Sequence, residues 1–123
     1  MSYALTILDR PGYLHFIVTG INSRETVAQY LEEVALKCAA RGCTRVLIEE
    51  RLDGPRLGTT DVYVVASSSA PAGAAVFEAI AYVDVNAAGG LMKFAEDVAA
   101  NRSAPVKVFA SVAQAEVWLA GGA

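Results

Sequence analysis

Hydroxyl and carboxyl groups lie together near the middle of the chain, where Gly58 is followed by Thr59, Thr60 and Asp61. An apolar segment that ends in acid, residues 45–50, precedes them, and in an α/β sheet ligands and partners usually bind at the carboxyl ends of strands. A threonine in the first turn of a helix can cap it, or carry a phosphate that the helix dipole stabilises, although Asp61 would repel that phosphate. Thr59, Thr60 and Asp61 are therefore candidates for a regulatory hydroxyl and partner-binding loop, with plain capping as the alternative.

Other residues that could do chemistry form no recognised catalytic pattern. His15 is the single histidine and has no serine or cysteine nucleophile motif near it in sequence. Glu49 and Glu50 are adjacent, so on a strand they face opposite sides and cannot act as a carboxylate pair. Ser67–Ser69 lacks the Gly-x-Ser-x-Gly elbow, and Gly89-Gly90 lacks a Walker lysine. The sequence therefore predicts no catalytic residue, no cofactor and a protein that is not an enzyme.

Two cysteines, Cys38 and Cys43, lie at the end of a predicted helix and just beyond it. The chain contains no CxxC pair, no HExxH motif and no acidic calcium loop, so no metal site is predicted. We expect both cysteines to be buried or half-buried free thiols.

Length and composition favour one globular domain, residues 1–123. The chain has 123 residues, 54% of them hydrophobic and 19% charged. No apolar run approaches the roughly 20 residues of a membrane span, and the start MSYALTILDR has no secretory pattern, so we expect a soluble, cytoplasmic protein. A net charge of −3 with scattered basic residues makes nucleic acid a poor partner.

Hydrophobic periodicity and turn residues predict nine elements. The expected strands are Ala4–Leu8, Tyr13–Thr19, Thr44–Glu50, Ala79–Val85 and Val106–Phe109. The expected helices run from an Asn22 cap, paired with Glu25 as a capping box, to Gly42; from Thr59 or Thr60 to a break at Pro71 and Gly73; from Leu91 to near Asn101; and from a Ser111 cap to the Gly121-Gly122 tail.

The resulting order, ββαβαβαβα, is that of an α/β fold with a five-stranded, mostly parallel sheet and an N-terminal hairpin. Polar residues interrupt the strands, which fully covered parallel strands rarely tolerate; these are Arg45, Glu49, Tyr82, Asp84 and Lys107. We therefore expect the helices mainly on one face and a partly open second face, suited to another subunit or a ligand.

The end of the chain, VKVFASVAQAEVWL, resembles the bacterial SpoIIAA-like family, which shares the fold of anti-sigma-factor antagonists and other STAS domains. The resemblance lies in Phe109, Ala115, Trp118 and Leu119, together with the order of elements over nearly the whole chain. STAS regulators commonly carry an Asp-Ser-Ser/Thr-Gly motif after the third strand. The segment 58–61 stands at about that place, with the acid after the hydroxyls and no glycine following them.

Two functions follow as hypotheses. The resemblance implies a non-enzymatic interaction or regulatory module that binds a partner protein or forms a homodimer. The alternative is a carrier or sensor that holds a small apolar or amphipathic ligand in a pocket lined by Tyr63, Phe77, Tyr82 and Phe94.

Overall fold

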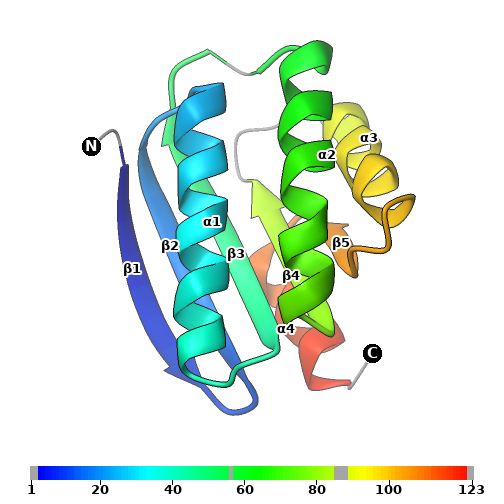
Figure 1. The fold of residues 1–123 in the computed structure, drawn as a ribbon. Coiled ribbons are helices and arrows are strands. Elements are labelled where there is room, and N and C mark those ends of the chain that lie inside the picture. The colour runs from blue at the N-terminus through cyan, green and yellow to red at the C-terminus, as the bar shows by residue number, and fades with distance from the viewer. Residues whose placement is uncertain (1–2, 56, 85–88, 122–123) are drawn as a thin grey trace.

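The computed structural model describes residues 3–55, 57–84 and 89–121, which form the nine elements in the predicted order (Figure 1). They are β1 (Tyr3–Arg10), β2 (Tyr13–Ile21), α1 (Arg24–Ala40), β3 (Arg45–Asp53), α2 (Thr59–Val76), β4 (Ala79–Asp84), α3 (Gly89–Ala100), β5 (Val106–Phe109) and α4 (Val112–Ala120). The α/β class is confirmed. Val85 and Asn86, predicted to end the fourth strand, lie outside the described residues. None of the helices in the described part of the chain is long and apolar enough to cross a membrane.

The five strands form one mixed sheet in the order β1-β2-β3-β4-β5. β1 and β2 are antiparallel and joined by a tight turn in which Gly12 has φ +86°, a conformation that glycine adopts readily. The remaining pairs, β2-β3, β3-β4 and β4-β5, are parallel. Because the parallel strands share one direction, the polar residues that end β3 and β4 lie at the same edge, and Glu50 is the register partner of Asp84.

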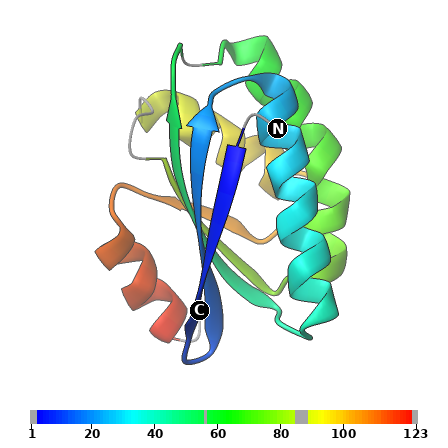
Figure 2. The ribbon, with the colours of Figure 1, turned by 90° about the vertical axis from the view of Figure 1, so that its left-hand side faces the viewer.

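Helices cover both faces of the sheet, but unequally. Figure 2 shows α1 and α2 on one side and α4 on the other, and α3 packs beside α2 (Figure 1), in agreement with the prediction that most helices share one face. The main core lies between the sheet and the helices α1 and α2, and it includes Phe16, Tyr30, Val46, Ile48 and Leu52. The strand residues among them alternate along their strands with those of the opposite face, as the period of a strand requires.

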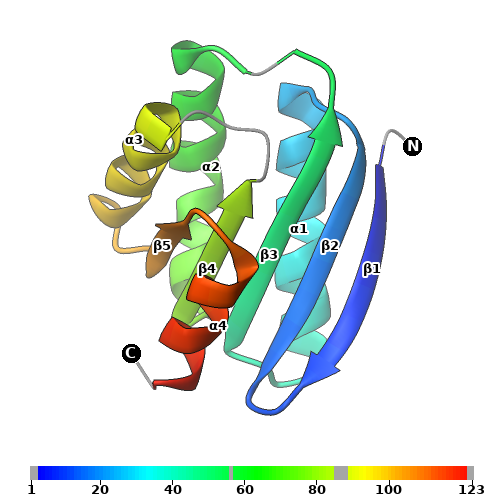
Figure 3. The same ribbon diagram turned by 180° about the vertical axis from the view of Figure 1, so that it is seen from behind.

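The second core lies between α4 and the other face of the sheet. Leu47 and three small residues of β4 pack there against Ala115 and Leu119. Small side chains on β4 let the helix approach the sheet closely. Figure 3 shows that α4 lies over β4 and the neighbouring ends of β3 and β5, whereas β1 and β2 have no helix on this side. The second face is therefore partly open.

The predicted cap of α1 is wrong. Ser23, not Asn22, caps α1: its hydroxyl accepts a hydrogen bond from the backbone N–H of Thr26 at 3.0 Å. Asn22 instead continues the β2 edge, donating its backbone N–H to the Asp53 carbonyl at 2.7 Å. Asn22 and Ser23 are both suitable cap residues, and the backbone hydrogen bond of Asn22 to β3 leaves Ser23 as the cap. The capping box between Asn22 and Glu25 therefore does not form.

Helix α2 also differs from prediction, because it continues through Pro71 to Val76. Pro71 is exposed. Proline has no N–H to donate to the carbonyl oxygen one turn earlier in the helix, and at an exposed position water can bind that oxygen instead. Gly73 permits close packing, since a Cβ there would meet Ile80 Cδ1 at 3.3 Å. The choice of helix over strand for residues 63–65 is confirmed.

Candidate ligand-binding cavity

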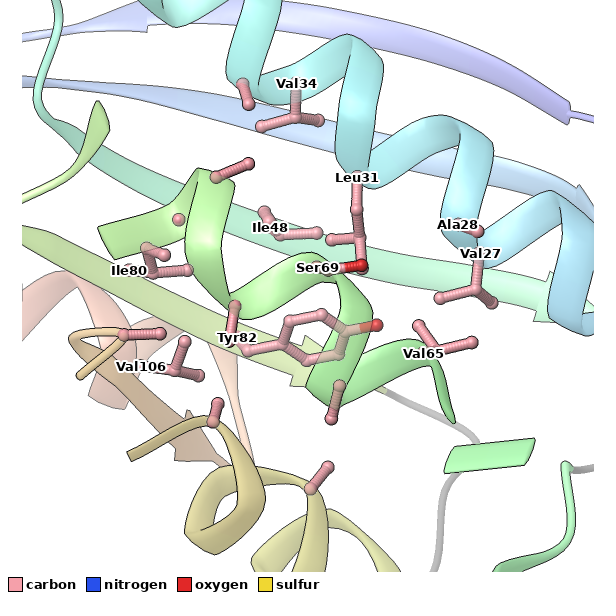
Figure 4. A pocket seen from close by; sticks show the side chains of 18 of the residues that line it. Val27, Ala28, Leu31, Val34, Ile48, Val65, Ser69, Ile80, Tyr82 and Val106 are labelled. Atoms are coloured by element: carbon pink, nitrogen blue, oxygen red, sulfur yellow. The ribbon is translucent and has the colours of Figure 1, made fainter. Parts of the chain in front are cut away.

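A cavity of about 490 Å³ lies between the three-helix layer and the sheet (Figure 4). Its walls are mainly aliphatic and come from every element around it, including Leu31 of α1, Val65 of α2, Ala95 of α3, Ile80 of β4 and Val106 of β5. Its volume falls within the range of about 300–1,000 Å³ that is usual for small-molecule sites. The arrangement follows from the fold, because three amphipathic helices and one sheet face turn their apolar sides toward the same space.

Three polar residues reach this cavity from the sheet: Glu50 of β3, and Tyr82 and Asp84 of β4. They share a face because Glu50 alternates with the buried Ile48, which also faces the helices, and the register pairs Ile48 with Tyr82 and Glu50 with Asp84. In Figure 4 the Tyr82 ring projects from β4 into the cavity. An apolar chamber thus has one polar end.

Tyrosine hydroxyls hold Glu50 in place. Tyr30 of α1 and Tyr82 both donate hydrogen bonds to Glu50 Oε2, and the two hydroxyls contact each other. Tyr30 is fully buried and Glu50 is 3% exposed. A carboxyl group buried this deeply requires such partners, because an isolated charge in an apolar interior is very unfavourable. We call Tyr30, Glu50, Tyr82 and Asp84 the carboxyl-tyrosine cluster.

The pKa of Glu50 is raised to about 7, mainly by burial and then by the nearby charge of Asp84, while the two tyrosine hydrogen bonds act in the opposite direction. A hydrogen bond with Asp84 also raises the Glu50 pKa. Burial and the charge of Glu50 raise the pKa values of Tyr30 and Tyr82 well above the ordinary value, so both hydroxyls are neutral donors at physiological pH.

A second buried acid, Glu49, lies on the opposite face of the sheet, as the alternation of adjacent strand residues predicts. His15 Nε2 and Glu49 Oε1 are 2.8 Å apart, and Arg51 binds the other carboxylate oxygen. His15 and Glu49 are 4% and 3% exposed, and His15 Nδ1 has no partner among the described residues. This pair does not line the cavity. Its polar contacts tie β2 to β3 on the face away from the three helices.

The structure places the predicted regulatory residues away from the cavity. Thr59 and Thr60 are exposed residues of the first turn of α2, and the cap of that helix is Gly58, without a side-chain hydrogen bond. The prediction that either threonine caps the helix is therefore wrong, because α2 begins one residue earlier than a threonine cap requires. Asp61 is half-buried, and Arg24 Nη1 lies 3.6 Å from its Oδ1.

Two of the four predicted pocket residues line the cavity, and two do not. Phe77 and Tyr82 are the two that line it. Tyr63 is 45% exposed and lies against Arg102, whose Nη2 donates to the tyrosine hydroxyl at 3.0 Å. Phe94 is half-buried on α3 and is not a lining residue. Tyr63 and Phe94 therefore lie outside the cavity.

Cysteine chemistry does not contribute to this site. Cys38 is buried, Cys43 is half-buried, and both are free thiols, as predicted. Burial raises the pKa of the Cys38 thiol to about 12, which keeps it protonated and unreactive. Within residues 3–55, 57–84 and 89–121, no three His, Cys, Asp or Glu side chains are grouped so that they could hold a metal ion.

No protein-family model matches this chain, and no curated protein matches it in sequence. The SpoIIAA-like resemblance therefore stays a prediction.

Proposed function

We propose that this protein binds a small apolar or amphipathic molecule in the cavity between its three-helix layer and its sheet. The observation that carries the proposal is an apolar cavity of about 490 Å³ with the carboxyl-tyrosine cluster at one end. Ligand sites typically combine apolar walls with a few polar groups that fix the orientation of the ligand. Protein cores, in contrast, are close-packed and contain few voids larger than a water molecule.

Filling the cavity tests this proposal. Ser69 of α2 lines the cavity and its side chain is drawn there in Figure 4. Ser69→Phe would place an aromatic ring in the space that a ligand requires. We expect the uncharged dye Nile red to fluoresce strongly with the wild-type protein, and its affinity to fall about tenfold or more in the variant, since each 1.4 kcal/mol of lost contact is tenfold.

Ser67→Phe is the matched control, because Ser67 lies on the same helix and does not line the cavity. Its affinity for Nile red should equal that of the wild type. Circular dichroism checks that each variant is folded. Equal binding to the wild type and to folded Ser69→Phe would contradict the proposal, as would an absence of dye binding to the wild type.

A second candidate function is a SpoIIAA-like interaction module that forms a homodimer. The observation that favours it is the part of the second face that α4 leaves uncovered over β1 and β2 (Figure 3). Ile17 faces that side, half-buried, and Ile21 at the end of β2 is 59% exposed. A second copy could cover this surface and bury both apolar side chains.

Sedimentation velocity tests the homodimer. We expect a concentration-dependent dimer that Ile17→Lys converts to a monomer, because a buried lysine would be unpaired at the interface. Val117→Lys, on the exposed side of α4, serves as the control and should leave the dimer intact. A wild-type protein that stays monomeric at high concentration would remove this candidate.

A further inference from the structure

The two cysteines of the chain lie in the turn that ends α1 and leads to β3 (Figure 1). The Cys43 N–H donates to the Cys38 carbonyl oxygen at 2.9 Å, and the Gly42 N–H donates to the Ala39 carbonyl oxygen at 3.2 Å. Gly42 has φ +66°, which completes a Schellman motif. The first and last residues of this motif commonly pack against each other. Here they are the cysteines, and the Cys38 thiol forms a hydrogen bond with that of Cys43.

The two thiols differ in their access to solvent. Cys38 is 0% exposed and belongs to the main core. Cys43 is half-buried and lines a surface hollow of about 380 Å³ that lies apart from the apolar cavity. Arg10 and Arg41 line the same hollow, with Asp9 as the one acid among its lining residues. A small reagent can therefore reach Cys43 beside two positive charges, whereas Cys38 is reached only by its neighbour.

We propose that Cys38 and Cys43 are a peroxide-sensitive dithiol that closes to a disulfide. The Cys43 thiolate attacks one oxygen of hydrogen peroxide, so that an S–O bond forms, the O–O bond breaks and the leaving hydroxide takes a proton to become water. The Cys38 sulfur then attacks the resulting sulfenic acid. The S–S bond forms, the S–O bond breaks, and the leaving hydroxide departs as a second water with the Cys38 proton. Two thiols are oxidised, and one peroxide is reduced to two waters.

The surroundings of the thiols determine the order of these steps. Burial raises the pKa of Cys38 to about 12, and the contact with Cys43 contributes, so Cys38 is inert toward a reagent in solution. It can still act second, because a group held against its target reacts as if it were present at very high concentration. At Cys43, positive side chains stabilise the negative charge that develops on the leaving oxygen. This inference does not depend on the proposed binding function.

Peptide mapping of the wild-type protein tests the disulfide directly. The reduced full-length protein is treated with hydrogen peroxide at low protein concentration, and free thiols are then blocked with iodoacetamide in urea. Trypsin cleaves after Lys37, Arg41 and Arg45, which places Cys38 in the peptide CAAR and Cys43 in the peptide GCTR. We expect these two peptides to be joined after oxidation and to separate with dithiothreitol. Cys38 alkylated while Cys43 carries a sulfinic acid, two alkylated thiols, or a disulfide between protein copies would overturn the proposal.

Single variants test the order of the two thiols. In Cys43→Ala the rate at which peroxide consumes thiol should fall about tenfold or more, because only the buried thiol remains. In Cys38→Ala the sulfenic acid has no partner, so dimedone should label Cys43. Circular dichroism checks that both variants are folded. Equal rates in the wild type and folded Cys43→Ala, or no dimedone label in folded Cys38→Ala, would overturn the assignment of Cys43 as the thiol that reacts first.

Discussion

Replacing Glu50 with glutamine is expected to remove about 3 kcal/mol of pH dependence from the free energy of unfolding. The pKa of Glu50 rises from 4.5 to about 7 on folding, and each pKa unit corresponds to about 1.4 kcal/mol. Burial is the main cause, followed by the charge of Asp84. Glutamine has nearly the same shape, can still accept from the two tyrosines and cannot titrate.

The sign follows from proton binding. With its pKa raised in the folded state, Glu50 holds its proton there over a range of pH in which it has lost it in the unfolded chain. Its contribution to stability is therefore fully present below a pH of about 4.5 and is lost as the pH rises to about 7. The groups that face Glu50 are Tyr30 from α1 and Tyr82 and Asp84 from β4.

Urea unfolding of the two proteins across this range measures the effect. The free energy of unfolding of the wild type, minus that of Glu50→Gln, should fall by about 3 kcal/mol between acidic and mildly alkaline pH. Glu25→Gln, at an exposed site, controls for the change in net charge. A difference that stays constant with pH would mean that Glu50 is not buried beside Asp84 as described.

Leu47→Ala is expected to lower the free energy of unfolding by about 2–5 kcal/mol, the usual cost of emptying a leucine site in a core. Leu47 is fully buried on the face of the sheet away from the three helices, where α4 covers it. The small residues around it, Ala79, Ala81 and Ala115, have little side-chain volume with which to fill the space. The loss should therefore lie toward the upper part of the range.

Val117→Ala provides the comparison on α4 itself. Val117 is 73% exposed, so its truncation should change the free energy of unfolding by no more than about 0.5 kcal/mol. Chemical denaturation of the wild type and both variants measures the two changes in the free energy of unfolding. A loss at Leu47 as small as that at Val117 would contradict the packing of α4 on the second face.

The sequence was sufficient to predict the fold class because its signals are local and agree with one another. Turn residues at 9–12 separate two alternating segments, and a three- and four-residue apolar stripe marks α1. Ser111 caps α4 as predicted, accepting from the Gln114 N–H at 3.2 Å. In contrast, the caps near Asn22 and Thr59 were wrong, because several polar residues compete at each start and tertiary pairing selects among them.

The candidate site was predicted only in part. Phe77 and Tyr82 were expected in a pocket and line the cavity, whereas Glu50 was considered only as a neighbour of Glu49. The contact between Glu50 and Asp84 depends on the register of β3 against β4, which residues far apart in sequence decide together. The burial of Tyr30 could have been predicted, because it follows Val27 by three positions and precedes Val34 by four, which places it on the apolar stripe of α1.

The most direct test of the central claim is to observe a ligand inside the cavity. Methyl-labelled protein saturated with Nile red would be examined by isotope-filtered NMR for nuclear Overhauser effects between ligand and protein. We predict contacts from the dye to the methyl groups of Leu31, Val65 and Val106, which come from α1, α2 and β5 around the cavity. Contacts confined to exposed methyl groups such as those of Ile21 and Val117, or no contacts at saturation, would contradict the account.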